Sequence, residues 1–435
     1  MKTKNCSKKS TFIRTGIIGT AALLITGSFA CSNNANTMKP QRWEMGTPIT
    51  TYFAGPPMKD AAATQMKEGG FNLVWTPESG MQTAQQHGLR WMLQTNLLNP
   101  RTAPHVLDDP VKFPQLQELI ARVKDNPQLY GYYIIDEPNA SQFEELGKTV
   151  AYLRRETPGK LAYINLLPTY ATNKQLGTSG DKITAYKAYL RQYIETVKPD
   201  LLSYDHYHFS EGKDGDDYFL NLSLIRQAAL EANIPFMGIV QACKFSPNVR
   251  TPNANELRWL NYTQLAYGSQ GISYFVYSVN SFYQKYKDNP GQMMTPDGTP
   301  TPQYEAAKKL NPQFVAIASQ LKSLHSLHAY HLGKNYSGTQ ELPKDAPFQM
   351  EFSGNNHLPA AGILMGYFGK ADKPTHVLVV NLDYANSVTT TISGPQRLAA
   401  FDAVTHKWDM ATTSKVLLHL PPGGGILVRI SHDNA

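Results

Sequence analysis

The sequence predicts a (β/α)8 TIM barrel followed by a small C-terminal antiparallel β-sandwich, and two patterns carry this prediction. Between about residues 48 and 324, eight short apolar runs alternate with amphipathic segments, and eight β-then-α units in about 280 residues are typical of such a barrel. After about residue 330, strand-length runs follow one another between Gly, Pro, Asn and Asp, with no helical periodicity between them. No glycine-rich phosphate loop favours the alternative, an open doubly wound sheet.

The eight apolar runs of the first part have strand length and are expected to lie parallel in a barrel over residues 41–328. They cover residues 49–53, 71–75, 89–93, 130–135, 161–166, 201–204, 236–240 and 272–276. Helical spacing is clearest for the apolar residues between positions 116 and 123 and between positions 304 and 324. After the fourth run, Ser141 and Glu144 have the spacing of a capping box at a helix start.

The second part predicts the β-sandwich over residues 335–435. Its runs cover residues 362–367, 377–382, 388–392, 416–420 and 426–430. His325, His328 and His331 fall at the junction of the two parts with a spacing of three. No cysteine or acid accompanies these histidines, so we expect them to pack and form hydrogen bonds there rather than to bind a metal.

Residues 1–30 have the pattern of a bacterial lipoprotein signal peptide. A basic opening precedes an apolar run over residues 16–25, which is too short to span a bilayer, and small residues lead to Cys31 in a pattern that resembles a lipobox. We expect cleavage before Cys31, lipidation of this cysteine, and a tether over residues 31–40; an ordinary signal peptide cut near Ala30 is the alternative. The chain is then exported and held by its lipid on the cell envelope, at the outer membrane.

The charge of the chain gives no case for nucleic acid as a partner. The net charge is +7, but five positive charges fall in the first 30 residues, which contain no acid, and removing that segment leaves +2. Aromatic residues make up 11% of the chain, with 24 tyrosines, which suits a surface that binds hydroxylated ligands. Three cysteines exclude a disulfide scaffold, and Cys243 lies in an apolar stretch where packing is its expected role.

The strongest catalytic signal closes the fourth apolar run. In a (β/α)8 barrel the active site lies at the carboxyl ends of the strands, and there the run over residues 130–135 leads directly into Asp136, Glu137 and Pro138. Two buried, adjacent carboxylates repel each other, so at least one keeps its proton. An acid that stays protonated near neutral pH is what the cleavage of a glycosidic bond requires. The alternative is that Asp136 and Glu137 cap the next helix or pair with Arg and Lys.

This segment resembles the strand-four motif of the clan A glycoside hydrolases, which are (β/α)8 barrels. In that clan an Asn-Glu pair, often followed by Pro, supplies the general acid/base, so the resemblance implies this role for Glu137. Over residues 41–430 the chain also resembles lipoprotein glycosidases of Bacteroidetes, including a Gly-rich last strand over residues 422–428. It departs from the clan at Asp136, where Asn is expected, and at Gln241, which ends the seventh run where the clan has a nucleophilic Glu.

Asp205, which ends the sixth run, is the best remaining carboxylate, and two mechanisms stay open. Asp205 is a nucleophile or base that works opposite Glu137. Alternatively, Asp136 and Glu137 resemble the Asp-Glu pair of hexosaminidases that use the substrate's own N-acetyl group. In that case Glu137 protonates the leaving group, and Asp136 orients the acetamido group.

Polar and aromatic residues near the ends of the other runs are expected to bind the sugar. They are Trp75, Glu78, Asn165, Tyr204, His206, His208, Gln241 and Tyr274. His206 and His208 also have a metal-ligand spacing, but in the amidohydrolase barrels such a pair lies on strand one, and here it follows strand six. We therefore expect no metal and no other cofactor.

The sequence thus predicts an enzyme of carbohydrate metabolism, a membrane-anchored glycoside hydrolase. It is expected to cleave O-glycosyl bonds of an oligo- or polysaccharide in the cell envelope or outside the cell, as in polysaccharide degradation. The alternative is a non-catalytic glycan-binding lipoprotein whose barrel has lost its nucleophile, and Gln241 is the residue that favours it.

Overall fold

The computed structural model describes residues 42–287, 291–354 and 356–431. The predicted signal peptide, the tether and the lipidation site Cys31 lie outside these residues. Among the described helices, none combines the length and apolar character that crossing a membrane would require.

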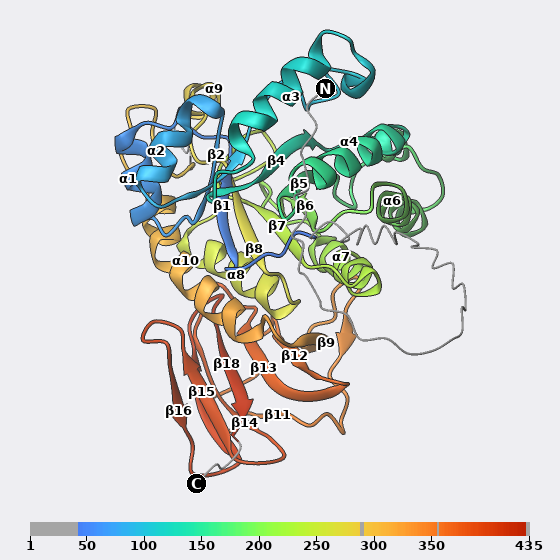
Figure 1. Cartoon of the computed structure of the whole chain (residues 1–435). Helices are drawn as coiled ribbons and strands as arrows, with labels where there is room; N and C mark the ends of the chain where they lie inside the picture. The colour runs from blue at the N-terminus through green and yellow to red at the C-terminus, as the bar shows by residue number, and fades with distance from the viewer. Residues whose placement is uncertain (1–41, 288–290, 355, 432–435) are drawn as a thin grey trace, which may run out of the picture. The chain divides into compact units, whose positions relative to one another are not determined.

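Eight parallel strands form the barrel (Figure 1). They are β1 (Ile49–Phe53), β2 (Leu73–Thr76), β3 (Arg90–Leu93), β4 (Leu129–Asp136), β5 (Leu161–Leu166), β6 (Leu202–His206), β7 (Phe236–Gln241) and β8 (Gly271–Phe275). Their order is β1-β8-β7-β6-β5-β4-β3-β2. Between the first and last of these, the Asn72 N–H donates to the Thr50 carbonyl at 3.0 Å and the Thr51 hydroxyl donates to the Leu73 carbonyl at 2.7 Å. These bonds nearly close the sheet, which confirms the predicted barrel.

Helices separate the barrel strands. They are α1 (Asp60–Glu68), α2 (Met81–Gln86), α3 (Lys112–Val123), α4 (Phe143–Glu156), α5 (Asn173–Leu176), α6 (Lys182–Val197), α7 (Tyr218–Ala232), α8 (Ala254–Ala266), α9 (Asn280–Lys285) and α10 (Pro302–Leu321), with the 3-10 helices η1 (Glu78–Gly80), η2 (Val106–Asp108) and η3 (Ala140–Gln142). Two predicted runs coincide with β1 and β5, and the other six differ from their strands by one or two residues at an end.

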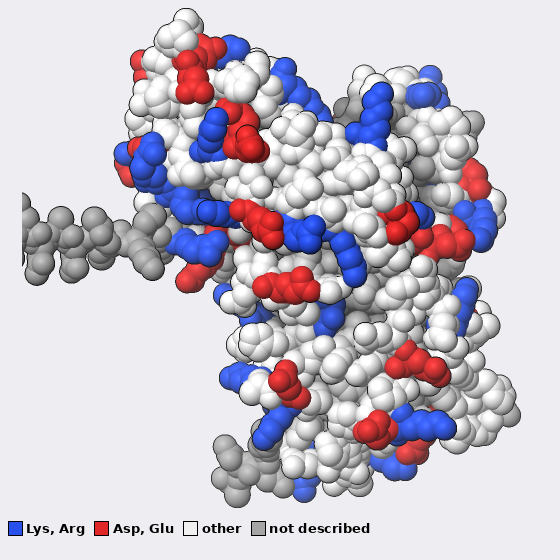
Figure 2. Space-filling model, turned by 90° about the vertical axis from the view of Figure 1, so that its right-hand side faces the viewer, with Lys and Arg blue, Asp and Glu red and all other residues white. Residues whose placement is uncertain are grey.

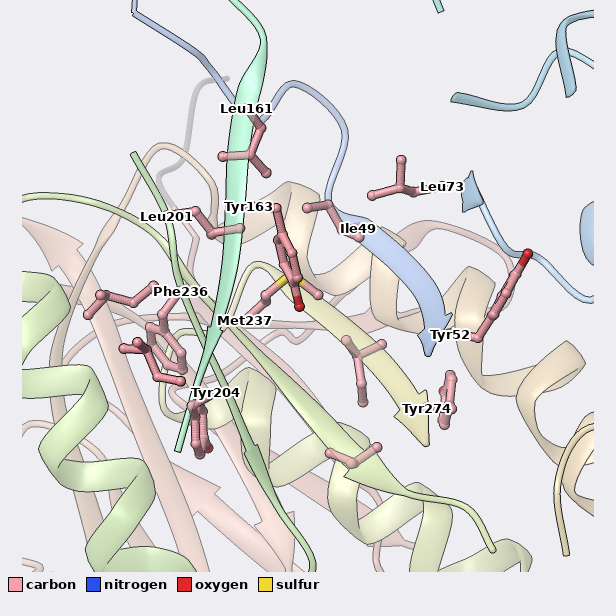
Figure 3. Packing of buried hydrophobic residues seen from close by; sticks show 14 of the residues in the cluster. Ile49, Tyr52, Leu73, Leu161, Tyr163, Leu201, Tyr204, Phe236, Met237 and Tyr274 are labelled. Carbon is pink, nitrogen blue, oxygen red and sulfur yellow. The ribbon is translucent and has the colours of Figure 1, made fainter. Parts of the chain in front are cut away.

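The pleat of the strands decides which side chains enter the barrel. On β6, Ser203 and Asp205 face inward, whereas Tyr204 and His206 face the helices. The interior is polar as well as aromatic: the hydroxyls of Tyr163 and Ser203 bond to each other at 2.7 Å. Figure 3 labels Ile49, Tyr163 and Tyr204 among the buried hydrophobic residues of this cluster. Because alternate residues of a strand point to opposite faces, neighbours in sequence serve different layers.

Ten strands follow the barrel. They are β9 (His325–Leu332), β10 (Gln340–Glu341), β11 (Gln349–Glu351), β12 (Ile363–Lys370), β13 (Lys373–Asn381), β14 (Val388–Ser393), β15 (Leu398–Asp402), β16 (Lys407–Met410), β17 (Lys415–Leu420) and β18 (Gly425–Ile430). One sheet has the order β10-β9-β12-β13-β18-β15-β16 and the other β11-β14-β17. All their pairings are antiparallel except that of β9 with β10. The predicted C-terminal sandwich is therefore present, although its first strand begins at His325, before the expected start at residue 335.

The two faces of the larger sheet bury different cores. Leu364 and Phe368 of β12 belong to the apolar cluster that also fills the barrel, whereas Ile363, Met365 and Tyr367 pack in a second cluster with residues of the smaller sheet. The alternation is the period of two that a strand buried on both faces requires. A Cβ placed on Gly366 would lie 2.1 Å from the Ala266 carbonyl oxygen, so β12 approaches the end of α8 closely. Residues 40–435 accordingly form one compact unit.

Of the three junction histidines, His331 packs as expected, whereas His325 and His328 are exposed. His331 is fully buried, and its Nε2 bonds to the Tyr267 hydroxyl at 3.0 Å. Burial lowers the pKa of His331 to about 3, so it is neutral at physiological pH.

The charged residues on the face shown in Figure 2 are mixed, with Lys and Arg interspersed among Asp and Glu. This face thus lacks the single-sign field that nucleic acid binding uses.

Candidate active site

An irregularity in β4 turns Asp136 into the barrel. The ladder with β5 pairs Tyr133 with Tyr163, skips a residue, and then pairs Ile135 with Ile164 and Asp136 with Asn165. Without the extra residue, strict alternation would put Tyr133 and Asp136 on opposite faces. With it, the Tyr133 ring packs on Trp75 and the Asp136 carboxyl reaches Asn165. Bulges of this kind are frequent next to active sites.

Glu137 directly follows the strand in a left-handed backbone conformation. Its φ is +48°, which is uncommon for a residue other than glycine. The Glu137 N–H donates to the Asn165 carbonyl at 2.9 Å, and this bond anchors the turn to β5. Residues held in such conformations cost about 1–3 kcal/mol and cluster at functional sites.

The Asn165 side chain joins two of the three predicted carboxyls. Its amide Nδ2 donates to Asp136 Oδ1 at 3.0 Å and to Asp205 Oδ1 at 2.8 Å. Its oxygen accepts from the Ser203 hydroxyl at 3.0 Å, which fixes the orientation of the amide. The structure therefore brings Asp136, Glu137, Asp205 and Asn165 together at the carboxyl ends of β4, β5 and β6.

Glu137 and Asp205 are neighbouring acids, each of which shifts the pKa of the other. Asp205 Oδ2 is buried and has no hydrogen-bond partner among the described residues. Two carboxyls near each other cannot both ionise without a cost in free energy. Burial, followed by the charges of Glu137 and Asp136, raises the pKa of Asp205 well above its usual range. Burial and the charge of Asp136 also raise the pKa of Glu137, so the pair keeps a proton at a pH where free carboxyls are ionised.

An arc of half-buried aromatic rings lies around this end of the barrel. Phe53 ends β1 and stacks on Phe275, which ends β8, with ring centres 5.8 Å apart. Tyr133 packs on Phe53 at 6.3 Å, and Tyr207 packs on Phe275 at 5.1 Å. The charges of Asp136 and Glu137 act on the hydroxyls of Tyr133 and Tyr207, so both tyrosines stand beside the acids. Aromatic faces and carboxyls together suit a ring that has apolar C–H faces and hydroxyl edges.

Sequence reasoning missed Phe53, Tyr133 and Phe275 of this arc as well as Arg101 and Tyr170. Arg101 Nη2 donates to the Asp136 carbonyl at 2.7 Å, and the Tyr170 hydroxyl accepts from the Tyr207 N–H at 3.3 Å. Burial raises the pKa of Tyr170, and the charges of Asp205 and Glu137 contribute, which places its hydroxyl near the pair. Phe53 ends a predicted strand and Phe275 is the last residue but one of another, so their position near strand ends was the available signal. Arg101 and Tyr170 lie in loops, where no residue spacing identifies them as site residues.

Three of the predicted sugar-binding residues face the helices instead of the acids. The Tyr204 hydroxyl accepts from Gln264 of α8 at 2.8 Å. His206 bonds to Asn221 of α7 at 2.9 Å. The Tyr274 hydroxyl donates to Asn261 at 3.0 Å and to Asn311 at 2.9 Å. Each is at most 3% exposed. Because the alternate residue of each strand faces inward, these side chains stand on the outside of the barrel wall.

Gln241 and His208 serve the loops that follow β6 and β7. The Gln241 amide accepts from the Phe209 N–H and donates to the Phe209 carbonyl, both at 2.9 Å, and it also donates to the Arg250 carbonyl. His208 stacks on Trp259 of α8 with ring centres 4.9 Å apart. Gln241, at the end of β7, is thus occupied by main-chain groups. Gln241 is polar because its amide anchors these loops.

The last two predicted residues are also engaged elsewhere. The Trp75 indole N–H donates to the Thr51 hydroxyl at 2.9 Å, and the ring packs on Tyr163 inside the barrel. Glu78 pairs with Arg122 of α3 through bonds of 2.7 and 2.9 Å, and this partner lowers the pKa of Glu78. Within the described residues, no group of three or more His, Cys, Asp or Glu side chains is arranged to hold a metal ion.

Comparisons with known proteins assign no family to the chain. No family model matches it, and no curated protein matches it. Solved structures similar to the chain are glycosidases. The β-galactosidase of the psychrophilic Marinomonas ef1 is 11% identical with a TM-score of 0.44, over 63% of this chain and 60% of the other. The endo-β-1,4-mannanase of Thermotoga petrophila is 10% identical with a TM-score of 0.42, over 91% and 99%.

A glucosidase of Croceicoccus marinus is 12% identical with a TM-score of 0.44, over 91% of this chain and 98% of the other. At these identities and TM-scores the likenesses establish neither a family nor a reaction. The chemistry of the site has to be inferred from its own residues.

Proposed function

We propose that the chain is a glycoside hydrolase that cleaves an O-glycosidic bond of an oligo- or polysaccharide, with Glu137 as the general acid/base. The observation that carries the proposal is the cluster of Glu137, Asp136 and Asp205 at the carboxyl ends of the barrel strands. Burial raises the pKa of Glu137 and Asp205, so they keep a proton to higher pH than free carboxyls do. Protonation of the leaving oxygen is the step for which such an acid is required.

The two acids of the pair have different roles because their exposure differs. Asp205 is 2% exposed and lies behind Glu137, which is half-buried and reaches the end of the barrel. Glu137 delivers the proton to the leaving oxygen. Asp205 bonds to Asn165 and shifts the pKa of Glu137. The arc of Phe53, Tyr133, Phe275 and Tyr207 supplies the faces on which the sugar ring packs.

A second candidate mechanism is attack by an N-acetyl group of the substrate. Asp136 is the residue that would orient the acetamido group, because it is half-buried and only Asn165 bonds to its side chain among the described residues.

Hydrolysis of a panel of aryl glycosides and polysaccharides by the purified chain tests the proposal. Release of a reducing sugar or of the aryl group is the expected result. If N-acetylhexosaminides alone are cleaved, a thiazoline analogue inhibits, and Asp136→Asn loses activity, the substrate-assisted mechanism is supported. Glycans that bind tightly without turnover would instead support the non-catalytic glycan-binding protein that Gln241 suggests.

The proposed location is the cell envelope, with the lipid of Cys31 as the anchor. The proposal rests on the lipobox-like sequence before Cys31. Cys31→Ser is expected to move the protein from the membrane fraction to the soluble fraction with its fold intact. Unchanged partition of this variant would contradict the anchor and leave the catalytic proposal untouched.

A further inference from the structure

The guanidinium of Arg101 stands beside the acid pair with donors to spare. Its Nη2 donates to the main-chain carbonyl oxygens of Asp136 at 2.7 Å and Glu137 at 3.5 Å. A guanidinium has five N–H donors on three nitrogens. Within the residues that the structure describes, the Arg101 side chain makes no other hydrogen bond and no ion pair, and it is exposed. Arg101 is thus held at one nitrogen and keeps the others for a ligand.

Several other arginines of the barrel are neutralised by carboxylates, whereas Arg90 and Arg226 also bond to uncharged groups. Arg122 pairs with Glu78 at 2.7 Å, and Arg250 pairs with Asp214 at 3.0 Å and with Glu256 at 2.8 Å. Arg101 meets carbonyl oxygens, which fix its position without cancelling its charge. A positive charge that is fixed in place and uncompensated is the chemistry of an anion-binding site.

A second donor lies on the strand whose end holds Arg101. Tyr133 and Asp136 both belong to β4, and the Asp136 carbonyl accepts from Arg101. The Tyr133 hydroxyl takes part in no hydrogen bond with a described residue, and its ring is half-buried against Trp75 and Phe53. Burial and the charge of Asp136 raise the pKa of Tyr133, and the charge of Arg101 lowers it. Tyr133 therefore remains an O–H donor on the side of the site that Arg101 occupies.

The acids of the site do not cancel the charge of Arg101 in full. Burial raises the pKa of Asp136, and burial together with mutual repulsion raises the pKa of Glu137 and Asp205. Protons kept by these acids reduce the negative charge that an anionic ligand would meet. An anion beside Arg101 is consequently compatible with the cluster.

We infer that Arg101 and Tyr133 bind the carboxylate of a uronic acid residue in the glycan, next to the bond that Glu137 protonates. A planar carboxylate matches the fork of a guanidinium, whereas the hydroxymethyl group of a neutral hexose carries no charge to meet it. The inference rests on the proposed function for the identity of the cleaved bond. Recognition of the uronic acid itself is measurable without turnover.

Calorimetric titration of the Glu137→Gln chain with uronic acid trimers, neutral hexose trimers of the same linkage and 6-sulfated hexose trimers tests the inference. The uronic acid trimer is expected to bind at least about tenfold more tightly than the neutral one. Adding Arg101→Gln should weaken uronic acid binding roughly 10- to 100-fold, the range for loss of a hydrogen bond to a charged group, and change neutral binding less than about twofold. Lys112→Gln is the matched control, because this substitution removes the same charge. The Lys112 side chain donates to the Thr102 carbonyl at 3.1 Å, in the loop that carries Arg101.

Several results would overturn the inference. One is equal affinity for the acidic and neutral trimers, and others are a preference for the sulfated trimer or no binding of any uronic acid trimer. Another is an equal loss of affinity for the uronic acid and neutral trimers in the Arg101→Gln variant. The last result would mean that Arg101 only supports the turn at Glu137. Uronic acid binding that depends on Arg101 in a chain that cleaves no glycoside would contradict the proposed function and leave this inference standing.

Discussion

Asp205 illustrates how a single residue can serve a site at the expense of the fold. It is almost completely buried, and its pKa is raised by burial and by the neighbouring acids. A group whose pKa is raised on folding stabilises the folded state fully below its ordinary pKa, and this contribution is lost as pH rises through the raised value. The wild type should therefore become less stable as pH rises from the acidic range toward and above neutrality.

Asp205→Asn should remove the loss of stability that the wild type undergoes as pH rises. The Asn side-chain oxygen can still accept from Asn165, so the cost of substitution is small. We expect the variant to exceed the wild type by about 1–2 kcal/mol in unfolding free energy at pH 8, and to match it near pH 4, since one pKa unit corresponds to about 1.4 kcal/mol. Urea unfolding at the two pH values measures this. A variant less stable than the wild type at pH 8 would show that Asp205 carries no unfavourable charge.

Residue-level reasoning from the sequence brings Asp136, Glu137 and Asp205 to one end of the barrel because the carboxyl ends of parallel strands converge. It misplaced Tyr204, His206 and Tyr274. Near the end of a strand, successive side chains point alternately into the barrel and out toward the helices, so a position near the end does not show which way a side chain points. Which residue faces inward depends on the phase of the pleat, and on β4 one irregularity shifts that phase. No sequence pattern at residues 130–136 marks where this extra residue falls.

At the scale of elements, β7 ends in an anchor for two loops. Gln241 bonds to both main-chain groups of Phe209 and to the Arg250 carbonyl, and it is fully buried. Gln241→Leu would leave the Phe209 N–H and the Arg250 carbonyl without this partner, whereas the Phe209 carbonyl still accepts from the Arg250 N–H. We expect a loss of about 2–4 kcal/mol in unfolding free energy, because each buried group left unsatisfied costs about 1–3 kcal/mol.

Gln241→Glu separates anchoring from chemistry. A carboxylate restores the residue type that clan A barrels have at the end of strand seven, but it cannot donate to two carbonyl oxygens. We expect this variant to be destabilised as well and to gain no hydrolytic activity over the wild type. Urea unfolding and aryl glycoside assays measure the two outcomes, and a gain in turnover would show that Gln241 faces the substrate.

The start of the helical segment after β4 shows why helix caps resist prediction. The sequence predicts a box of Ser141 and Glu144, but this prediction is wrong. The Asn139 side chain accepts from the Ser141 N–H at 3.0 Å, and the Gln142 side chain accepts from the Asn139 N–H at 2.9 Å. Asn139 is an equally good cap, and it lies closer to the turn at Glu137. The chain begins its 3-10 helix η3 there, two residues before the predicted position.

At the scale of the whole molecule, the barrel and the larger C-terminal sheet share an apolar cluster. Gly366 lies where β12 approaches α8, and a Cβ there would meet the Ala266 carbonyl oxygen at 2.1 Å. Gly366→Ala should lower the unfolding free energy by about 1–3 kcal/mol or more, the cost of overpacking. Gly215→Ala is the control, because its nearest contact would be 3.5 Å, at the His208 carbonyl.

Thermal unfolding of the two glycine variants measures this, and a single transition is expected because the cluster is continuous. Equal Tm values for Gly366→Ala and Gly215→Ala would contradict the close packing. The two-part organisation itself was predictable from the change in periodicity near residue 330. The start of the sheet at His325 was not, because β9 follows the last long helix without the turn residues that mark the other strands.

The central claim is that Glu137 donates a proton to the leaving group of a glycoside. Initial rates of the wild type and Glu137→Gln on aryl glycosides with leaving groups of graded acidity test it most directly. The account predicts a loss of about 10²–10⁴ in turnover for poor leaving groups, the range for a general acid, and a much smaller loss for good ones. Because burial and the charge of Asp136 raise the pKa of Glu137, wild-type activity on poor leaving groups should fall as pH rises through that raised pKa. Near wild-type turnover of Glu137→Gln on every leaving group would contradict the account.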